Sequence, residues 1–471
     1  MTQVPRVVIA APNSGSGKTT VATGLMAALT ARGQQVSGHK IGPDYIDPGY
    51  HALATGRPPR NLDPVLCGEE RIAPLFRHGA RGADIAVIEG VMGLFDGAAQ
   101  PDTPFDGPGD LASTAHVAAL LGAPVLLVVD ASRTSRSIAA LVHGFRDYDP
   151  RVRVAGVILN QVGSPRHEEL LRAAVADTGL PVLGAIHRNT TLSTPSRHLG
   201  LVPAAEREND ANAMVSTLGG IIEAACDLPG IHQIASTAKP IPSAVWDAQS
   251  ELAVAQPYPH LRVAIAGGAA FTFSYREQVE LLQAGGAEVV PVDPLQEPRL
   301  PKDTAALILG GGFPEEHAEA LAANRPLREA VSGLVERGGP IAAECAGLLY
   351  LCRGLDGTPM TGVLPARAEM TPRLTLGYRS AVAVRDSVLA VAGTRVHGHE
   401  FHRTATTPAF GPDLGANGRL GAAWQWSTDG PEGFANARLH ASYLHVHWAG
   451  EPSLAQRFLD AARQHRGGRQ Q

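Results

Sequence analysis

The sequence predicts an α/β protein with two doubly wound domains, each built on a mostly parallel sheet. The first observation is an apolar run, a Gly/Ser loop and a helical pattern in direct succession at Val7–Thr20. The second is a series of continuous apolar runs that alternate with helical patterns, as in sheets covered on both faces. The third is a fresh start of this alternation at Leu261, after a stretch at 228–260 that is rich in Pro, Ala, Ser and Gln.

The first domain is expected to span residues 1–227. After the first helix, apolar runs predict strands at Gln35–His39, Asp84–Glu89, Pro124–Val129, Val152–Leu159 and Pro181–Ile186. Helical patterns lie between these strands, for example at Asp110–Leu121 and Ser135–Phe145. The segment Lys40–His51 is expected to be a loop because it contains Gly and Pro.

The second domain is expected to span residues 261–453, after a linker at 228–260 and before a C-terminal helix and polar tail at 454–471. It begins with a strand at Leu261 and a helix at Tyr275–Ala284, and three more strands follow in the runs AEVVPV, AALILGGG and PIAAEC. Beyond Leu364 the spacing predicts short strands and turns, at Ala381–Val384, Gly421–Gln425 and Ala441–Trp448.

Composition and charge exclude several classes of partner. The net charge is −5 and no basic stripe is present, so neither nucleic acid nor a membrane is an expected partner. No apolar stretch reaches the roughly 20 residues that span a bilayer. The cysteines show no metal-binding spacing and are too few for a disulfide framework, which fits a cytoplasmic protein; they are Cys67, Cys226, Cys345 and Cys352.

The loop that follows the first strand has the features of a phosphate-binding P-loop. Its glycines allow backbone N–H groups to face phosphate oxygens at a helix N-terminus. Lys18 would reach the β- and γ-phosphates and Thr19 would ligate Mg²⁺. Pro12 stands where the usual motif has glycine, so the first turn must differ from the common form. The predicted nucleotide-binding residues are Ser14, Gly15, Ser16, Gly17, Lys18, Thr19 and Thr20.

A second chemical centre is predicted at Cys345. The run PIAAECAGLLYL reads as a strand, a tight turn and a helix, which is the pattern of a nucleophile elbow. A helix N-terminus there is expected to lower the pKa of the thiol. Upstream, Gly311 and Gly312 follow a strand, and with Ala346 they are expected to offer N–H groups to an oxyanion.

Two histidines late in the chain are candidates for the base that removes the thiol proton. His445 and His447 alternate on one predicted strand, so only one of them can face Cys345, and either could be the base. We take His445 as the candidate. Cys352 lies two helical turns after Cys345 and is expected to pack in the core.

Eight motifs together resemble the cobyrinic and hydrogenobyrinic acid a,c-diamide synthase family over nearly the full chain. The second domain resembles class I glutamine amidotransferases and the first resembles P-loop NTPases. Two departures are visible: Ala343 stands where glycine is common, and His447 stands where that class has a glutamate, which suggests a Cys–His pair. The motifs are APNSGSGKTT, KIGPDYIDP, NLDP, EGVMGLFDG, GGGFPE, AECAGLLYL, GHEFH and SYLHVHW.

The resemblance implies an ATP- and glutamine-dependent ligase of cobalamin biosynthesis. Such an enzyme amidates the a and c carboxylates of a corrin-type macrocycle. ATP would convert each carboxylate into an acyl phosphate, and a cysteine would release ammonia from L-glutamine. ATP and Mg²⁺ are therefore the expected cofactors.

The resemblance also implies roles for residues outside the two loops. Asp47 and Glu89 would join Thr19 around Mg²⁺. Lys40 would neutralise the transferring phosphoryl group, and substrate or metal contacts are expected from Asp44, Tyr45 and Asp96. Asn160 ends a strand where this class often contacts the base, although an Asn there is as commonly a turn former. The histidines of HGHEFH at 397–402 are expected to contact substrate rather than a metal.

Two other functions fit parts of the same pattern. One is the same chemistry on another tetrapyrrole, such as nickel-sirohydrochlorin. The other is a non-catalytic P-loop ATPase that acts as a switch or scaffold, against which the intact AECAG and GGGFPE motifs argue. A homodimer is a further hypothesis.

Overall fold

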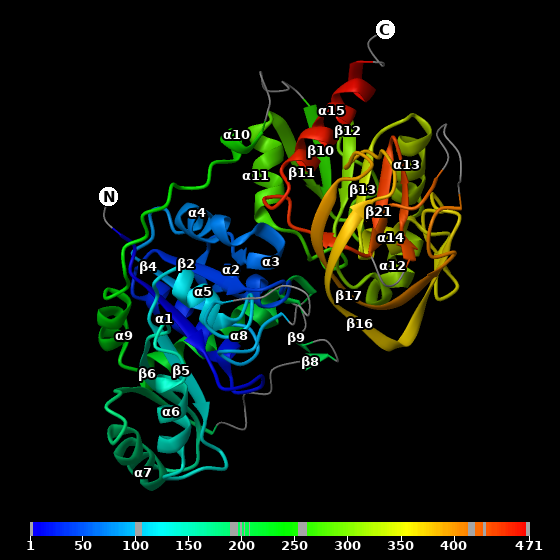
Figure 1. Ribbon diagram of the computed structural model, residues 1–471. Coiled ribbons are helices and arrows are strands. Elements are labelled where there is room, and N and C mark those ends of the chain that lie inside the picture. The colour runs from blue at the N-terminus through cyan, green and yellow to red at the C-terminus, as the bar shows by residue number, and fades with distance from the viewer. Residues whose placement is uncertain are drawn as a thin grey trace. The chain divides into compact units, whose positions relative to one another are not determined.

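The computed structural model describes residues 3–98, 106–188, 196–197, 200–201, 203–206, 208–252, 261–412, 420–426 and 430–467. The chain divides into two compact units, Met1–Trp246 and Asp247–Gln471 (Figure 1). The stretch 228–260, expected to be a linker, contains two short helices, and its residues up to Trp246 belong to the first unit. Residues 253–260 and the end of the polar tail, 468–471, lie outside the described residues.

The first unit is built on a seven-stranded sheet with the order β3-β2-β4-β1-β5-β6-β7. Every pair in it is parallel, as the apolar runs predicted. A two-stranded antiparallel sheet lies apart from it, formed by β8 (Ser196–Arg197) and β9 (Gly200–Leu201). The strands of the main sheet are β1 (Arg6–Ala10), β2 (Val36–Ile41), β3 (Arg60–Leu62), β4 (Ile85–Glu89), β5 (Val125–Asp130), β6 (Val154–Val162) and β7 (Val182–His187).

The helices of the first unit alternate with these strands. Helix α1 contacts both α8 and α2. Gly24 permits the first of these contacts, because a Cβ there would lie 2.8 Å from the Leu218 carbonyl oxygen. The helices are α1 (Lys18–Ala31), α2 (Asp47–Thr55), α3 (Pro64–Cys67), α4 (Glu69–Gly79), α5 (Thr114–Leu120), α6 (Ile138–Asp147), α7 (Pro165–Ala176), α8 (Glu208–Ala225), α9 (Leu228–Ala235) and the 3₁₀ turn η1 (Ala204–Glu206).

The expectation of a loop throughout Lys40–His51 is wrong. Strand β2 ends at Ile41, and α2 begins at Asp47. Pro48 sits in the first turn of α2, where its missing N–H costs no hydrogen bond, and Gly56 ends the helix in a left-handed conformation with φ 65°. The short loop between β2 and α2 therefore places Asp47 at a helix start, beside the end of β2.

The second unit contains a six-stranded sheet with the order β11-β10-β12-β13-β21-β20, parallel except for the last pair. Helix α15 contacts α11, β10 and β12 (Figure 1). The strands are β10 (Leu261–Ala266), β11 (Ala287–Val292), β12 (Thr304–Leu309), β13 (Ile341–Glu344), β20 (Phe434–Asn436) and β21 (Leu439–Ser442). The helices are α10 (Ala248–Glu251), α11 (Arg276–Ala284), α12 (Ala318–Ala323), α13 (Arg325–Glu336), α14 (Ala346–Leu351), α15 (Ser453–Gly467) and the 3₁₀ turn η2 (Pro314–His317).

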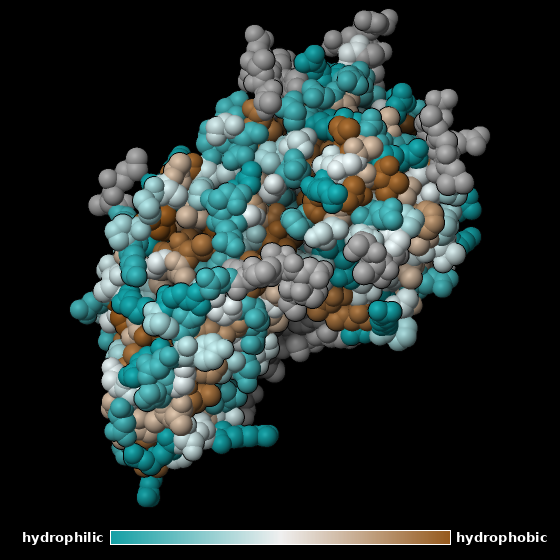
Figure 2. Space-filling view, in the orientation of Figure 1, coloured by the Kyte–Doolittle hydropathy of each residue, from teal (hydrophilic) through white to brown (hydrophobic). Residues whose placement is uncertain are grey.

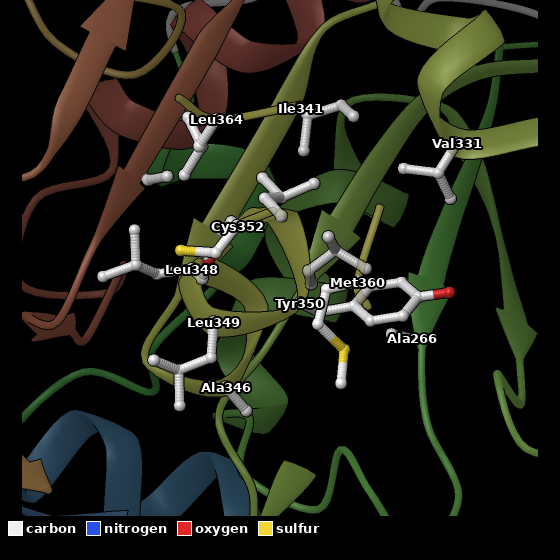
Figure 3. Packing of buried hydrophobic residues seen from close by; sticks show 14 of the residues in the cluster. Ala266, Val331, Ile341, Ala346, Leu348, Leu349, Tyr350, Cys352, Met360 and Leu364 are labelled. Carbon is white, nitrogen blue, oxygen red and sulfur yellow. Dashed lines mark hydrogen bonds between the residues drawn. The ribbon is translucent and has the colours of Figure 1, made fainter. Parts of the chain in front are cut away.

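The core of the second unit surrounds α14, whose residues are all buried. Figure 3 shows Leu348, Leu349, Tyr350 and Cys352 packed among residues of neighbouring elements. Cys352 is 0 % exposed, and its thiol donates a hydrogen bond to the Leu348 carbonyl at 3.3 Å. Burial raises the pKa of Cys352 to about 12, so it is a packing residue as predicted.

The second unit also has a mostly antiparallel sheet, of which the sequence predicted only short segments, at Ala381–Val384, Gly421–Gln425 and Ala441–Trp448. It centres on the paired long strands β16 (Arg367–Ala383) and β17 (Arg395–Thr407), of which only Ala381–Val384 was expected. Many residues of β16 are exposed or half-buried, so the apolar run that marks a buried strand is missing. The other strands are β14 (Gly354–Leu355), β15 (Thr358–Pro359), β18 (Trp424–Trp426), β19 (Gly430–Glu432) and β22 (His445–Val446).

The visible surface carries polar residues distributed over both units, with smaller apolar areas between them (Figure 2). Among the described residues, no helix combines the length and the apolar character needed to cross a bilayer.

Candidate active sites

The P-loop joins β1 to α1 through two glycines with left-handed backbone, Gly15 with φ 82° and Gly17 with φ 95°. A side chain at either position would be strained, so the loop requires glycine there. Ser16 is buried, and its hydroxyl donates a hydrogen bond to Asn13 Oδ1 at 2.5 Å. At the two ends of the predicted motif, Ser14 is exposed and Thr20 is half-buried. The loop is therefore held in shape by its own residues.

The ammonium of Lys18 is held by backbone oxygens at the P-loop. Its Nζ donates to the Asn13 carbonyl at 3.1 Å and to the Met92 carbonyl. Met92 has a left-handed backbone, with φ 46°. Burial and the nearby Lys40 lower the pKa of Lys18 to about 8, so the side chain is poised to gain from an anionic ligand.

Three oxygen atoms that were predicted to bind Mg²⁺ meet beside the loop. Thr19 Oγ1 donates to Glu89 Oε1 at 2.6 Å and to Asp47 Oδ2 at 3.2 Å. Glu89 ends β4 and Asp47 begins α2, so the parallel sheet and the short β2–α2 loop bring them together. The structure thus gathers one hydroxyl and two carboxylates, the ligand types of a hard cation.

Lys40, at the end of β2, lies against the same carboxylates. Its Nζ is 2.6 Å from Asp47 Oδ2, 2.9 Å from Glu89 Oε1 and 3.4 Å from Asp44 Oδ2. Burial opposes the charge on Lys40, but the three carboxylates outweigh it and raise the pKa of Lys40 well above its ordinary value. In the same way, burial opposes ionisation of Glu89, and Lys40 with His51 still lowers the pKa of Glu89 to about 2. Lys40 and Glu89 therefore form a charged pair near neutral pH.

The remaining substrate candidates of the first unit surround this cluster. The Asp44 carboxylate accepts hydrogen bonds from the N–H groups of Ile46 and Asp47, and burial with the Asp47 charge raises its pKa. Tyr45, next to it, is half-buried. Asp96 is exposed, and its carboxylate accepts the Gly93 N–H at 3.0 Å, which shapes the turn after β4.

Asn160 lies beside the P-loop. Its Nδ2 donates to the Ser16 carbonyl at 2.9 Å, and a Cβ on Gly17 would lie 2.3 Å from that nitrogen. The side chain thus supports the backbone of the loop and explains why residue 17 must be small. The expected contact of Asn160 with a nucleotide base stays a prediction.

Cys345 stands at a sharp turn between β13 and α14, with the left-handed φ of 47° and ψ of −99°. Its N–H donates to the Ser442 carbonyl at 2.8 Å, and the Gly347 N–H donates to the Gly310 carbonyl at 3.0 Å. A Cβ at Gly347 would lie 2.3 Å from the Leu309 carbonyl oxygen, so only glycine fits there. These contacts build the predicted nucleophile elbow and join it to the triple-glycine turn.

The thiol of Cys345 differs from the expectation in one respect. Burial and the Glu315 carboxylate raise the pKa of Cys345 far above its ordinary value, whereas the Ala346 N–H lowers it only in part. The prediction of a lowered pKa is therefore wrong, because α14 is short and the sulfur lies in a buried and acidic setting. A neutral thiol needs a base when it attacks.

One of the three predicted oxyanion donors is also corrected. The Gly311 N–H donates to the Phe273 carbonyl at 3.0 Å, as part of a bridge between the two residues. Gly311 is instead required for packing, because a Cβ there would lie 2.4 Å from His445 Cε1. The donor roles of Gly312 and Ala346 stay predictions.

The structure separates the two candidate bases. His445 packs against Gly311, and its Nδ1 is 3.7 Å from Glu344 Oε2. His447 lies 3.5 Å from Glu277 on α11, and its ring contacts the tilted ring of Tyr275 at a separation of 4.2 Å. His445 is therefore the histidine beside the triple-glycine turn and Glu344, and its role as the base stays a prediction.

The HGHEFH segment forms part of β17 and runs close to Cys345. The Phe401 carbonyl is 4.0 Å from the Cys345 sulfur. His402 stacks on Tyr443 at 3.8 Å, and Glu400 pairs with Arg379 at 2.7 Å. Within the described residues, no group of three or more His, Cys, Asp or Glu side chains is arranged to hold a metal ion.

Sequence reasoning missed three residues of these sites, of which His51 and Glu432 are buried and Glu344 is half-buried. His51 Nε2 is 2.7 Å from Glu89 Oε2, and Glu344 directly precedes Cys345. Glu432 accepts hydrogen bonds from the Ser442 hydroxyl at 2.6 Å and the Tyr443 N–H at 2.8 Å. Glu344 lies inside the recognised motif AECAGLLYL and His51 lies three residues after KIGPDYIDP, but no spacing rule connects them to their partners.

Comparisons with known proteins agree with the two predicted domain types. Residues 7–202 match the model of the CobQ/CobB/MinD/ParA nucleotide binding domain, and residues 262–453 match the CobB/CobQ-like glutamine amidotransferase domain. The chain is 58 % identical to hydrogenobyrinate a,c-diamide synthase of Streptomyces coelicolor, with 98 % of each chain covered. It is 53 % identical to the Thermobifida fusca protein of the same name, with 97 % of each covered. It is 43 % identical to cobyrinate a,c-diamide synthase of Gloeobacter violaceus, with 96 % of each covered.

These identities extend over both units and confirm the family, the two domain types and the α/β fold that the motifs predicted. They also exclude the non-catalytic scaffold, since the relatives are named as enzymes. The chain is a nucleotide-binding enzyme and belongs to the hydrogenobyrinate and cobyrinate a,c-diamide synthase family.

Proposed function

We propose that this chain uses ATP and glutamine to amidate the a and c carboxylates of hydrogenobyrinate. The observation that carries the proposal is the 58 % identity to a hydrogenobyrinate a,c-diamide synthase across 98 % of both chains. The relative from Gloeobacter violaceus, which is named for cobyrinate, is less similar, with 43 % identity. The metal-free macrocycle is therefore the favoured substrate.

The first unit would activate the carboxylate. A carboxylate oxygen of the macrocycle attacks the γ-phosphorus of ATP, and ADP leaves, which gives an acyl phosphate. Lys18 would bind the β- and γ-phosphate oxygens through its ammonium, and the P-loop N–H groups would bind the others. Lys40 would offset the charge of the transferring phosphoryl group. Asp44, Tyr45 and Asp96 would orient the macrocycle.

The proposed Mg²⁺ site consists of Thr19, Asp47 and Glu89. Their oxygens already lie within 2.6 to 3.2 Å of the Thr19 hydroxyl, which supports a shared cation. Bound there, Mg²⁺ would neutralise charge on the phosphate oxygens. His51 would hold Glu89 in place through its 2.7 Å contact with the second carboxylate oxygen.

The second unit would supply the nitrogen. Cys345 attacks the side-chain amide of glutamine while His445 takes the thiol proton, and the tetrahedral oxyanion would be met by the N–H groups of Gly312 and Ala346. His445 then gives its proton to the leaving nitrogen, and ammonia departs from a glutamyl thioester. Water hydrolyses the thioester to glutamate and restores the thiol. Ammonia displaces phosphate from the acyl phosphate and forms the amide.

The proposal is tested by incubating the purified protein with ATP, Mg²⁺ and glutamine and one of three macrocycles. The macrocycles are hydrogenobyrinate, cobyrinate and nickel-sirohydrochlorin, and the products are weighed by mass spectrometry. We expect two hydroxyl-to-amine exchanges on hydrogenobyrinate, with a higher kcat/KM than on cobyrinate. Turnover of nickel-sirohydrochlorin alone would overturn the proposal.

Three further points are proposals with their own tests. Mg²⁺ dependence follows from the oxygen cluster and is checked by titration after chelation. A homodimer is checked by light scattering of the purified chain. A cytoplasmic location is supported by the four free cysteines and is checked by cell fractionation.

A further inference from the structure

Class I amidotransferases of the resembled type pair their histidine with a glutamate two residues later, and this chain has His447 there. His447 is 0 % exposed and lies beside Tyr275 and Glu277. Position 447 therefore supplies no acid to His445.

A carboxylate is present on the other side of the histidine. Glu344 Oε2 is 3.7 Å from His445 Nδ1, and the His445 side chain is 1 % exposed. The pairing of β13 with β21 places Glu344 opposite Ser442, three residues before His445. The strand register therefore fixes the approach of this carboxylate to the ring.

We propose that Glu344 is a positioning residue that orients His445 through Nδ1 and stabilises its protonated form, in place of the acid that usually follows the histidine. With Nδ1 directed at Glu344, Nε2 is the nitrogen that exchanges the proton with Cys345. This inference rests on the proposed nucleophilic role of Cys345. The 3.7 Å separation is longer than a hydrogen bond and suits a pair that tightens when glutamine binds.

Two neighbours of His445, His399 and Phe273, do not provide this support. His399 faces it across the β17–β22 pair, and burial, His445 and Arg379 lower the pKa of His399 to about 3, so it is neutral. The Phe273 ring lies 6.5 Å away and carries no charge. Glu344 is the carboxylate whose distance to His445 places it in ion-pair range.

The effect of Glu344 on the nucleophile has two opposing parts. Burial, Glu315 and Glu344 all disfavour a thiolate at Cys345, so Glu344 acting alone would make the sulfur less reactive. Acting through His445, Glu344 favours the imidazolium that forms when the thiol gives up its proton. Removing the Glu344 charge should therefore raise the pH midpoint of thiol alkylation if Glu344 acts through His445. The same change should lower that midpoint if Glu344 acts only on Cys345.

The test uses Glu344→Gln, with Glu344→Asp as the conservative variant. We expect Glu344→Gln to lower kcat with glutamine about 100-fold with little change in KM, and Glu344→Asp to recover part of it. The alkylation of Cys345 by iodoacetamide is followed against pH, and its midpoint should move about one pH unit higher in Glu344→Gln. Glu277→Gln, which removes the carboxylate beside His447, is the matched control and should leave the midpoint unchanged.

An unchanged or lower midpoint, or a loss of kcat below threefold, overturns the inference. The melting temperature of each variant shows whether the second unit is folded, and amidation with added ammonia, which does not need Cys345, shows whether the first unit is active. If wild-type turnover of the macrocycle is absent, the alkylation curve still tests the pair, so the two proposals fail separately.

Discussion

The two sites handle charge in opposite ways. In the first unit, Lys40 lies within 3.4 Å of three carboxylates, and the Lys40–Glu89 pair is charged before any ligand arrives. In the second unit, Cys345 is 3 % exposed and carries a neutral thiol. One site is organised by charge that is already in place, whereas the other creates charge only when its proton moves to a base. Substitutions should therefore affect the two sites through different measurements.

The largest effect is expected at the nucleophile. Cys345→Ala should lower glutamine-dependent amidation by roughly 10³-fold or more, since no other thiol stands at the elbow. Amidation with added ammonia should continue at near wild-type rate. In Lys18→Ala the pattern should reverse, with amidation lost for both nitrogen sources and glutamine hydrolysis retained. The rates are measured by product mass and glutamate release; glutamine-dependent turnover by Cys345→Ala would break the contrast between the sites.

A large effect on stability is expected at Lys40. Lys40→Met removes the cation from a buried carboxylate cluster and should lower the free energy of unfolding by about 3 kcal/mol. Mg²⁺ should then raise the melting temperature of the variant more than that of the wild type, because a second cation can replace the lost one. Lys302→Met, at an exposed lysine, is the control. An unchanged melting temperature in Lys40→Met would mean that the cluster is not organised by charge.

A moderate effect is expected on the pH dependence of ATP binding. The pKa of Lys18 is lowered to about 8, so the free enzyme loses this charge as the pH rises through 8. Phosphate oxygens favour the charged form, so ATP affinity should fall by up to about tenfold per pH unit above 8, and binding should take up a proton. Calorimetry in two buffers of different ionisation enthalpy measures this uptake. Lys18→Arg should bind with no such proton uptake, because arginine stays charged.

The smallest effect is expected at Glu432, which supports the strand leading to His445. Burial raises the pKa of Glu432 to about 8, although the Ser442 and Tyr443 hydrogen bonds oppose this. Between pH 4.5 and 8 the folded state keeps a proton that the unfolded chain releases, so the free energy of unfolding should fall as pH rises, by on the order of 1 kcal/mol per unit. Glu432→Gln should remove this slope, and the exposed Glu336→Gln should keep it. Denaturant unfolding of the wild type and both variants at several pH values measures how the free energy of unfolding changes with pH.

The parallel sheets and both loops were predictable because each depends on local pattern. A continuous apolar run such as that of β5 indicates a buried strand. A Gly-Lys pair such as Gly17 and Lys18, placed between such a strand and a helix, indicates a phosphate-binding loop. Long-range contacts were not predictable in this way. Glu344 meets His445 only through the register of β13 and β21, and the exposed β16 owes its pairing to β17 rather than to its own composition.

The two corrected predictions in the second unit also concern contacts between residues that are distant in sequence. The Gly311 N–H is used by Phe273, and the Cys345 thiol is controlled by burial rather than by the start of a short helix. Both outcomes depend on neighbours that are distant in sequence. Residue types therefore indicated the chemistry, whereas the assignment of each donor and charge required the fold.

The most direct measurement follows one oxygen atom from the carboxylate of the macrocycle. Hydrogenobyrinate labelled with oxygen-18 in its carboxylates is converted with ATP and glutamine, and the released phosphate is analysed by mass spectrometry. If the first unit forms an acyl phosphate and the second unit supplies ammonia, one labelled oxygen should appear in phosphate for each amide formed. Amide product accompanied by unlabelled phosphate would contradict this division of the reaction between the two sites.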